Sequence, residues 1–310
     1  HDLEKELNIS ACKLKILDTI QQVQFLVNFW KNPDLEEELI ANCANLLIKY
    51  SNEVVMKSKV IGLPLIVQHL AEIYKDELDE NFEQKIKKLD ITTIFRKIIY
   101  LSLNVFSTRH PLESGENLRN FSSPIQVHQF LAIVSFFDEQ FATNLGLILN
   151  KTEWSLERIA RCGIIKYDKN LNIQFNHETC AEFLIALLLF NFIQNINTFN
   201  EFHYDFFIQI LIVKKFQITR MFLEGLIENE GASKIGCDFR ECNKVEILFL
   251  CVCENLYKTF KLIVKELKEQ NPDFLKKCLK VKGNRGDNLL GLAAVVHIKL
   301  DFFDFIWQTF

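Results

Sequence analysis

The sequence predicts a mainly α-helical chain of several domains, interrupted by one short β-hairpin. Glycine and proline are scarce, with 10 Gly and 5 Pro among 310 residues, so few positions favour turns. Apolar residues recur at the three- and four-residue intervals of amphipathic helices along most of the chain. The stretch from Gly163 to Phe175 instead alternates β-branched or aromatic residues with polar ones, as strands do.

Two strands and a turn are expected in that stretch. Strand chemistry covers Ile164 to Tyr167 and Leu171 to Phe175, and Asp168-Lys169-Asn170 supplies the turn. The pattern before the hairpin predicts a helix over Trp154 to Cys162, and the apolar run after His177 predicts another. Helix, hairpin and helix in this order predict a winged-helix unit.

The first part of the chain reads as a small helical bundle. Cys12 to Trp30 is amphipathic, and Asp34 is expected to cap a second helix that runs to Tyr50. The charged stretch Lys75 to Lys88 is interpreted as a linker.

Two further helix starts are expected before residue 107. Pro64, two residues after Gly62, suits the first turn of a helix because its missing N–H costs nothing there. Asp90 or Thr92 is expected to cap the next helix. The polar stretch Ser107 to Ser123 is interpreted as a loop and a domain boundary.

Composition narrows the class of protein. A net charge of −4 gives no general attraction to nucleic acid or to anionic membranes. The longest apolar run, Phe183 to Phe190, is well short of the ~20 residues that a membrane span requires. Nine cysteines scattered along helices fit a reducing, cytoplasmic setting. The chain begins at His1 without a signal peptide, and we interpret it as a piece of a longer protein.

His177 is the residue whose position points most directly to a ligand. It lies between the second strand and the following helix, where unpaired N–H groups and the positive end of the helix dipole gather. A histidine at that place is able to donate a hydrogen bond to a phosphate. The alternative is that His177 only caps the helix or packs beside the hairpin.

The order of several motifs resembles the region that follows the nucleotide-binding core in NACHT-type STAND NTPases, and among them the arthropod type with C-terminal ankyrin repeats. The resemblance covers roughly residues 1 to 190. The motifs that carry it are Phe-Leu-x-x-Phe-Trp at 25–30, Gly-x-Pro-Leu-x-x-x-x-Leu-Ala-Glu at 62–72, Leu-Asp-x-Thr-x-Ile-Phe-Arg-Lys at 89–97, His-x-Phe-Leu-Ala at 128–132 and Phe-x-His-x-Thr-x-Ala-Glu-Phe at 175–183.

The resemblance implies a nucleotide-dependent switch used in signalling, as in innate immunity. Pro64, with Gly62 beside it, would pack against the adenine of ADP or ATP, and His177 would reach the β-phosphate of ADP. The ADP form would be closed and autoinhibited, and ATP would permit homo-oligomerisation. The expected partners are the protein's own upstream nucleotide-binding domain and a protein ligand bound through ankyrin repeats, with no membrane and no nucleic acid.

One departure from the family is large. The phosphate-binding loop Gly-x-x-x-x-Gly-Lys-Ser/Thr is missing, because none of the ten glycines is followed by Lys, and no Walker B segment is evident. We expect an upstream core to hold the nucleotide and its Mg²⁺. This chain alone is expected not to hydrolyse ATP, although the parent protein is expected to be an ATPase.

The last third of the chain is expected to be helical as well. Helices are predicted over Phe202 to Val213, Phe216 to Ile227 and Val245 to Lys268. The segment from Gly283 to Ala294 partly matches the ankyrin consensus, and Phe302 to Trp307 would be the second helix of that unit. Further repeats are expected to follow, since one repeat cannot bury its face alone.

These expectations divide the chain into five parts. They are a helical lid domain at 1–106 that follows a missing nucleotide-binding core, a linker at 107–123, a winged-helix domain at 124–195, a second helical domain at 196–280, and the start of ankyrin-like repeats at 281–310.

Three other functions are open on the sequence alone. A plain helical protein-protein interaction scaffold would need no nucleotide. A winged helix is able to bind nucleic acid, and positive charge is available on Lys151, Arg158, Arg161, Lys166 and Lys169. The cysteines at 237, 242, 251 and 253 are the one cluster to test for metal, but their spacing is poor for zinc and we expect no metal site.

Overall fold

The computed structural model is mainly helical, with one two-stranded antiparallel sheet in its described part, which confirms the predicted fold class at that level. It describes residues 17–55, 64–87, 90–109, 124–147, 159–160, 162–167, 173–194, 201–230, 245–282, 286–296 and 298–309. The chain divides into two compact units, His1–Leu101 and Ser102–Phe310. None of the helices in the described residues combines the length and apolar character needed to cross a membrane.

The first unit is a helical bundle. Its helices are α2 (Thr19–Phe29), α3 (Glu37–Val55), α4 (Pro64–Tyr74), α5 (Phe82–Ile86) and the first part of α6 (Ile91–Arg109). Asp18 opens α2 with a capping box, and Asp90 opens α6 by accepting from the backbone N–H and the hydroxyl of Thr93. At the other end of α2, the indole N–H of Trp30 donates to the Ala71 carbonyl at 2.8 Å and so ties α2 to α4.

Three expectations for this region are corrected. Helix α3 begins at Glu37, so Asp34 lies in the turn before it and does not cap it; the Asp34 N–H instead donates to the Asn32 side chain. The stretch taken as a linker, Lys75 to Lys88, contains α5, which packs on α3 because Phe82 and Ile86 are buried. Helix α6 continues to Arg109, into the stretch expected to be a loop.

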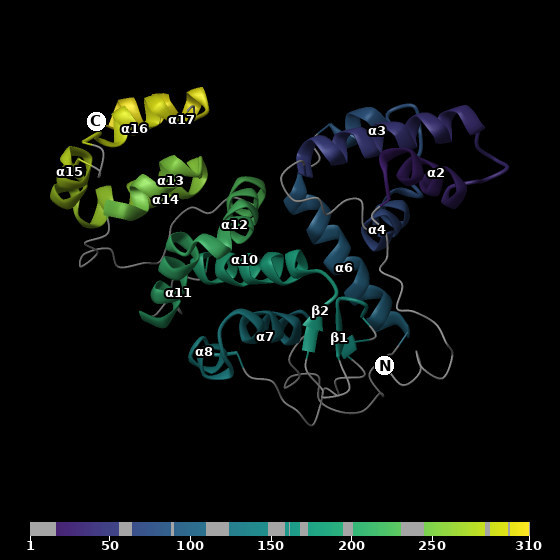
Figure 1. Ribbon diagram of the computed structural model, residues 1–310, viewed down its shortest axis with the longest axis horizontal. Helices are drawn as coiled ribbons and strands as arrows, with labels where there is room; N and C mark the ends of the chain where they lie inside the picture. Colours follow the sequence, from purple (N-terminus) through teal and green to yellow (C-terminus); the bar gives the residue numbers. More distant parts are fainter. Residues whose placement is uncertain are drawn as a thin grey trace. The chain divides into compact units, whose positions relative to one another are not determined.

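The second unit is organised around one buried helix, α10 (Glu178–Gln194). From Thr179 to Phe190 every residue of α10 is buried. Helix α7 (Pro124–Phe136) and helix α12 (Gln217–Glu230) both pack on it, and Figure 1 shows α10 between them. Helix α8 (Glu139–Asn144) follows α7 and packs on it.

The β-hairpin leads into α10. Strand β1 (Ile165–Tyr167) pairs antiparallel with β2 (Ile173–Phe175), and Ile165 lies opposite Phe175. The predicted strands are confirmed to within two residues at their ends, and the predicted turn at 168–170 lies outside the described residues. The preceding helix is described only at Ile159 and Ala160.

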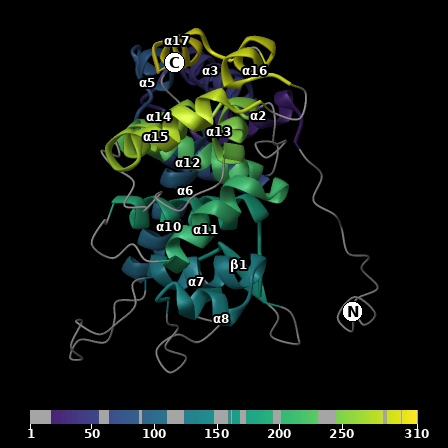
Figure 2. The ribbon, with the colours of Figure 1, turned by 90° about the vertical axis from the view of Figure 1, so that its left-hand side faces the viewer.

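Beyond α10 the chain forms a stack of helical hairpins (Figure 1 and Figure 2). The pairs are α11 (Glu201–Ile212) with α12, α13 (Val245–Cys253) with α14 (Tyr257–Gln270), and α16 (Leu289–Val295) with α17 (Leu300–Thr309). A 3-10 turn, η3 (Lys214–Phe216), joins the first pair, and α15 (Pro272–Lys280) packs on α14. First helices pack on first helices, α11 on α13 and α13 on α16, and α12 packs on α14.

The run from Val245 to Lys268, predicted as one helix, is two. Asn255 breaks it with a left-handed φ of 56°. The N–H of Asn255 donates to the Val252 carbonyl at 3.2 Å, and the N–H of Leu256 donates to the Cys251 carbonyl at 2.8 Å. These two bonds form a Schellman motif, with Asn in the place where Gly is most common.

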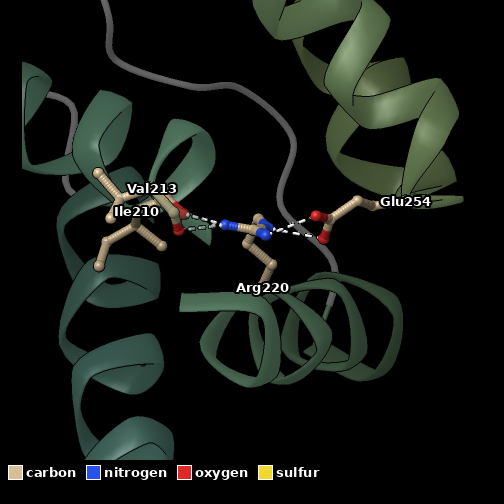
Figure 3. A network of polar contacts seen from close by, with 4 residues as sticks. All are labelled: Ile210, Val213, Arg220 and Glu254. Carbon is tan, nitrogen blue, oxygen red and sulfur yellow. Dashed lines mark hydrogen bonds and ion pairs between the residues drawn. The ribbon is translucent and has the colours of Figure 1, made fainter. Parts of the chain in front are cut away.

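A buried polar network holds consecutive pairs together (Figure 3). Arg220 of α12 is 1% exposed and forms a two-pronged ion pair with Glu254, at 2.6 and 2.8 Å. Its third nitrogen, Nη1, donates to the carbonyls of Ile210 and Val213, at 2.8 and 2.9 Å, where α11 ends. The guanidinium therefore links α11, α12 and the end of α13.

One turn further along α12, Glu224 provides the cap for α14. Leu256 occupies the N-cap position of α14 and has no side chain that is able to accept a hydrogen bond. The Glu224 carboxylate accepts from the backbone N–H of Lys258, and from the N–H and hydroxyl of Thr259 at 3.0 and 2.8 Å. The first turn of α14 is thus capped by another helix.

Replacing Asn255 tests the helix break. Asn255→Ala is expected to lower the free energy of unfolding by about 1 kcal/mol, because a left-handed φ is costly for a residue other than Gly or Asn. Asn255→Gly keeps that conformation at little cost and serves as the control. Urea unfolding measures the stability of both variants. An equal loss of unfolding free energy in the two would contradict the left-handed helix break at Asn255.

Replacing Arg220 tests the network. Arg220→Met is expected to lower the free energy of unfolding by about 3–5 kcal/mol, because it leaves the Glu254 carboxylate and two carbonyls without these donors. In a double-mutant cycle with Glu254→Gln, the two changes should couple by about 1 kcal/mol or more. Lys276→Met, which removes the exposed ion pair with Asp273, is the control and should lower the free energy of unfolding far less. If the losses of unfolding free energy at positions 220 and 254 simply add, the two side chains do not stabilise the fold through their ion pair.

Candidate functional site

The junction between β2 and α10 is the candidate site that the structure describes most fully. Asn176 fixes its geometry: the Asn176 N–H donates to the Ile164 carbonyl, and its side-chain amide donates to the Gly163 carbonyl, both at 2.9 Å. The end of β2 is thereby tied to the turn that precedes β1. His177 follows at once, immediately before the first residue of α10.

His177 is half-buried and caps α10. Its ring Nδ1 accepts from the backbone N–H of Thr179 at 3.1 Å, and its carbonyl accepts from the N–H of Cys180 at 3.0 Å. Burial lowers the pKa of the imidazole, and the nearby Glu178 carboxylate opposes that shift. Because Nδ1 is an acceptor, the proton of the neutral ring is on Nε2, which leaves one N–H to donate.

The structure therefore places His177 in its capping role, and the phosphate contact stays a prediction. One feature of the junction opposes an anion there. Glu178 lies in the first turn of α10, where a carboxylate already interacts with the positive end of the helix dipole. A phosphate at this end would have to compete with it.

Glu182 is a second ionisable group close to the junction. It is 5% exposed, one turn into α10 from Glu178. The pKa of Glu182 is raised to about 7, mainly by burial and also by the Glu178 carboxylate, while a hydrogen bond with the Thr179 side chain opposes the shift. In the sequence Glu182 stands out only as part of a motif; its place at the head of the apolar run that continues to Phe190 was the signal for its burial.

His128 of α7 is another buried polar group in the second unit. The Pro124 carbonyl accepts from its Nδ1 at 2.7 Å, so the proton of the neutral ring is on that nitrogen. Its Nε2 is buried without a hydrogen-bond partner, and burial lowers the pKa of the ring. Neutral His128 therefore belongs to the packing of α7, with one acceptor left unused.

The residues predicted to bind adenine lie in the first unit. Pro64 is the first residue of α4, which confirms the predicted helix start, and Gly62 lies outside the described residues. His177 belongs to the second unit. That Pro64 and His177 contact one nucleotide stays a prediction.

The structure gives little support to the two other candidate chemistries, metal binding by cysteines and nucleic-acid binding by the hairpin. Cys251 is fully buried, with its thiol pKa raised by burial, and Cys253 is exposed; residues 237 and 242 lie outside the description. Within the described residues, no three His, Cys, Asp or Glu side chains gather closely enough to hold a metal ion. Of the cations proposed for nucleic-acid contact, Lys166 is described, exposed on β1.

Comparisons of the chain with protein-family models, with curated proteins and with solved structures found no match.

Glu182→Gln tests the buried carboxyl. The folded-state pKa of about 7 lies above the ordinary 4.5, so the folded protein holds this proton more tightly than the unfolded chain does. The stability contributed by Glu182 should therefore fall as pH rises from about 4.5 to 7 and then level off. Glu182→Gln should be more stable than the native protein at pH ~8, by on the order of 1–3 kcal/mol, and close to it at pH ~4.5.

Urea unfolding across that pH range measures this difference. Glu178→Gln, which keeps Glu182, is the matched control and should retain most of the pH dependence. An unchanged pH dependence in Glu182→Gln would show that another group is responsible.

Proposed function

We propose that this chain is the regulatory part of a STAND-type, NACHT-related signalling ATPase. It holds ADP in a closed, autoinhibited state and permits oligomerisation when ATP replaces ADP. The observation that carries the proposal is His177 at the hairpin–helix junction: because Nδ1 caps α10, the proton of the neutral ring is on Nε2, the nitrogen that would donate to a phosphate oxygen. The order of the motifs from residue 25 to residue 183 supports it.

The two ring nitrogens have separate tasks in this proposal. Capping by Nδ1 fixes the ring orientation and the tautomer, so Nε2–H is oriented before any ligand arrives. A neutral donor also does not pay for desolvating a charge. The nucleotide and its Mg²⁺ are held by a nucleotide-binding core outside the 310 residues, with Pro64 as an apolar wall for adenine. The chain alone does not hydrolyse ATP, and its setting is cytoplasmic.

The first test of the proposal is the natural coding sequence upstream of the His1 codon. A Gly-x-x-x-x-Gly-Lys-Ser/Thr loop following a strand is expected within roughly one domain length, on the order of 150–250 residues. Its absence, with no separate protein that supplies such a loop, would overturn the proposal.

Two substitutions of His177 in the complete protein separate its two roles. His177→Ala removes both the cap and the phosphate donor, so it should lower the stability of the second unit by about 1 kcal/mol and speed ADP release. His177→Asn keeps a capping oxygen, so its stability should stay near native while ADP release becomes roughly ten- to hundredfold faster. ADP retention and the assembly state with ATP are the measurements. If His177→Asn retains ADP and assembles with ATP as the native protein does, the phosphate contact is refuted.

A second candidate function is a helical interaction scaffold that binds no nucleotide. The stack of helical pairs favours it, because such stacks present extended binding surfaces. The scaffold predicts that ADP changes neither the stability nor the assembly of the complete protein.

A further inference from the structure

The last two pairs of the stack meet through an aromatic contact between α14 and α17. Tyr257 and Phe260 are the first and fourth residues of α14, and both contact Phe302 and Phe305 of α17. Ring centroids lie 5.0 Å apart for Phe260 and Phe302, and 5.2 Å apart for Tyr257 and Phe302. The opposite side of α14, at Thr259, contacts Glu224 of α12. Helix α14 thus contacts α17 on one face and α12 on another.

Helix α17 has the same two-faced pattern, but its second face carries exposed apolar side chains. Leu300 and Phe303 are its first and fourth residues, in the places that Tyr257 and Phe260 hold in α14, and Trp307 lies one turn beyond Phe303. At about 100° per residue, Leu300, Phe303 and Trp307 fall within roughly 60° of arc, on the side opposite Phe302 and Phe305. Leu300 is 78% exposed and Trp307 is 64% exposed.

These three residues form an apolar stripe on the outer face of α17. Leucine and tryptophan at such exposure are unusual on one short helix, and their spacing of three and four residues makes them neighbours. The matching face of α14 is the one that receives α17. The stripe therefore continues the interface that already joins consecutive pairs of this stack.

We propose that the outer face of α17 docks a partner helical hairpin, which stacks on α16–α17 as α16–α17 stacks on α13–α14. The partner's second helix presents two aromatic side chains one turn apart, as α17 itself presents Phe302 and Phe305 to α14. A basic residue in the partner is also expected. In α14 the fifth residue, Lys261, lies 5.7 Å from the Phe305 ring, and the fifth residue of α17 is the exposed acid Asp304.

A synthetic peptide of residues 286–309 is the probe, because it carries the inner face that packs on α14. Trp307→Lys within the peptide removes its own outer stripe, and a fluorescent label at its N-terminus reports binding to the 310-residue chain by anisotropy. Saturable binding is expected, weakened roughly tenfold or more by Trp307→Glu in the chain, since a tryptophan often contributes most of the binding energy of an interface. Gln308→Glu, an exposed change on the same helix, is the matched control and should leave binding unchanged.

A second measurement covers the case in which the free peptide folds too weakly to bind. The same segment is joined to the C-terminus of the 310-residue chain by a Gly/Ser linker of about ten residues, which raises its local concentration to the millimolar range. Amide exchange over residues 300–309 should then slow in the native background and in Gln308→Glu, but not in Trp307→Glu.

Failure of both measurements, or equal binding by the Trp307→Glu chain, would overturn the proposal. Sedimentation of the native chain alone supplies another decisive outcome: a dimer abolished by Trp307→Glu, but not by Gln308→Glu, would make a second copy of this chain the occupant. This test requires no nucleotide, so its result is independent of the function proposed for His177.

Discussion

The second unit depends on satisfying the backbone groups at helix ends that are buried between stacked pairs. A helix leaves N–H groups unpaired at its start and carbonyls unpaired at its end, and burial without partners is costly. Arg220 and Glu224, one turn apart on α12, meet this constraint in both directions. Arg220 donates to the last carbonyls of α11, and Glu224 accepts from the first amides of α14. One helix therefore fixes the spacing of its neighbours on both sides.

The hairpin–helix junction follows the same rule on a smaller scale. Asn176 closes the end of β2, and His177 closes the start of α10, so each side chain satisfies backbone groups that the turn leaves open. This structural task uses one nitrogen of His177 and also fixes the other as a donor. The cap and the phosphate sensor, which were alternatives in the sequence, are compatible in the structure because they use different nitrogens.

Local signals made much of the fold predictable. Periodicity and scarce turn residues gave the helical class, Pro64 gave the start of α4, and Asp90 gave the start of α6. Non-local effects defeated the rest. The apolar periodicity of α13 and α14 runs through Asn255, whose left-handed turn depends on the hairpin it closes. The cap of α14 lies 34 residues away, at Glu224, so no local pattern encodes it. For the candidate site, the capping position of His177 was predictable from spacing alone, whereas the burial of His128 depends on the packing of α7 against α10.

The polar network also determines where the second unit is able to change shape. The Arg220–Glu254 pair and the Glu224 cap are directional and partly buried, so sliding α11, α12 and α14 past one another would separate charges and backbone groups from their partners. Between α10 and α12, Phe183 packs edge-on against Phe222, with ring centroids 5.2 Å apart. Because the polar contacts are directional, α11, α12 and the start of α14 are expected to move together.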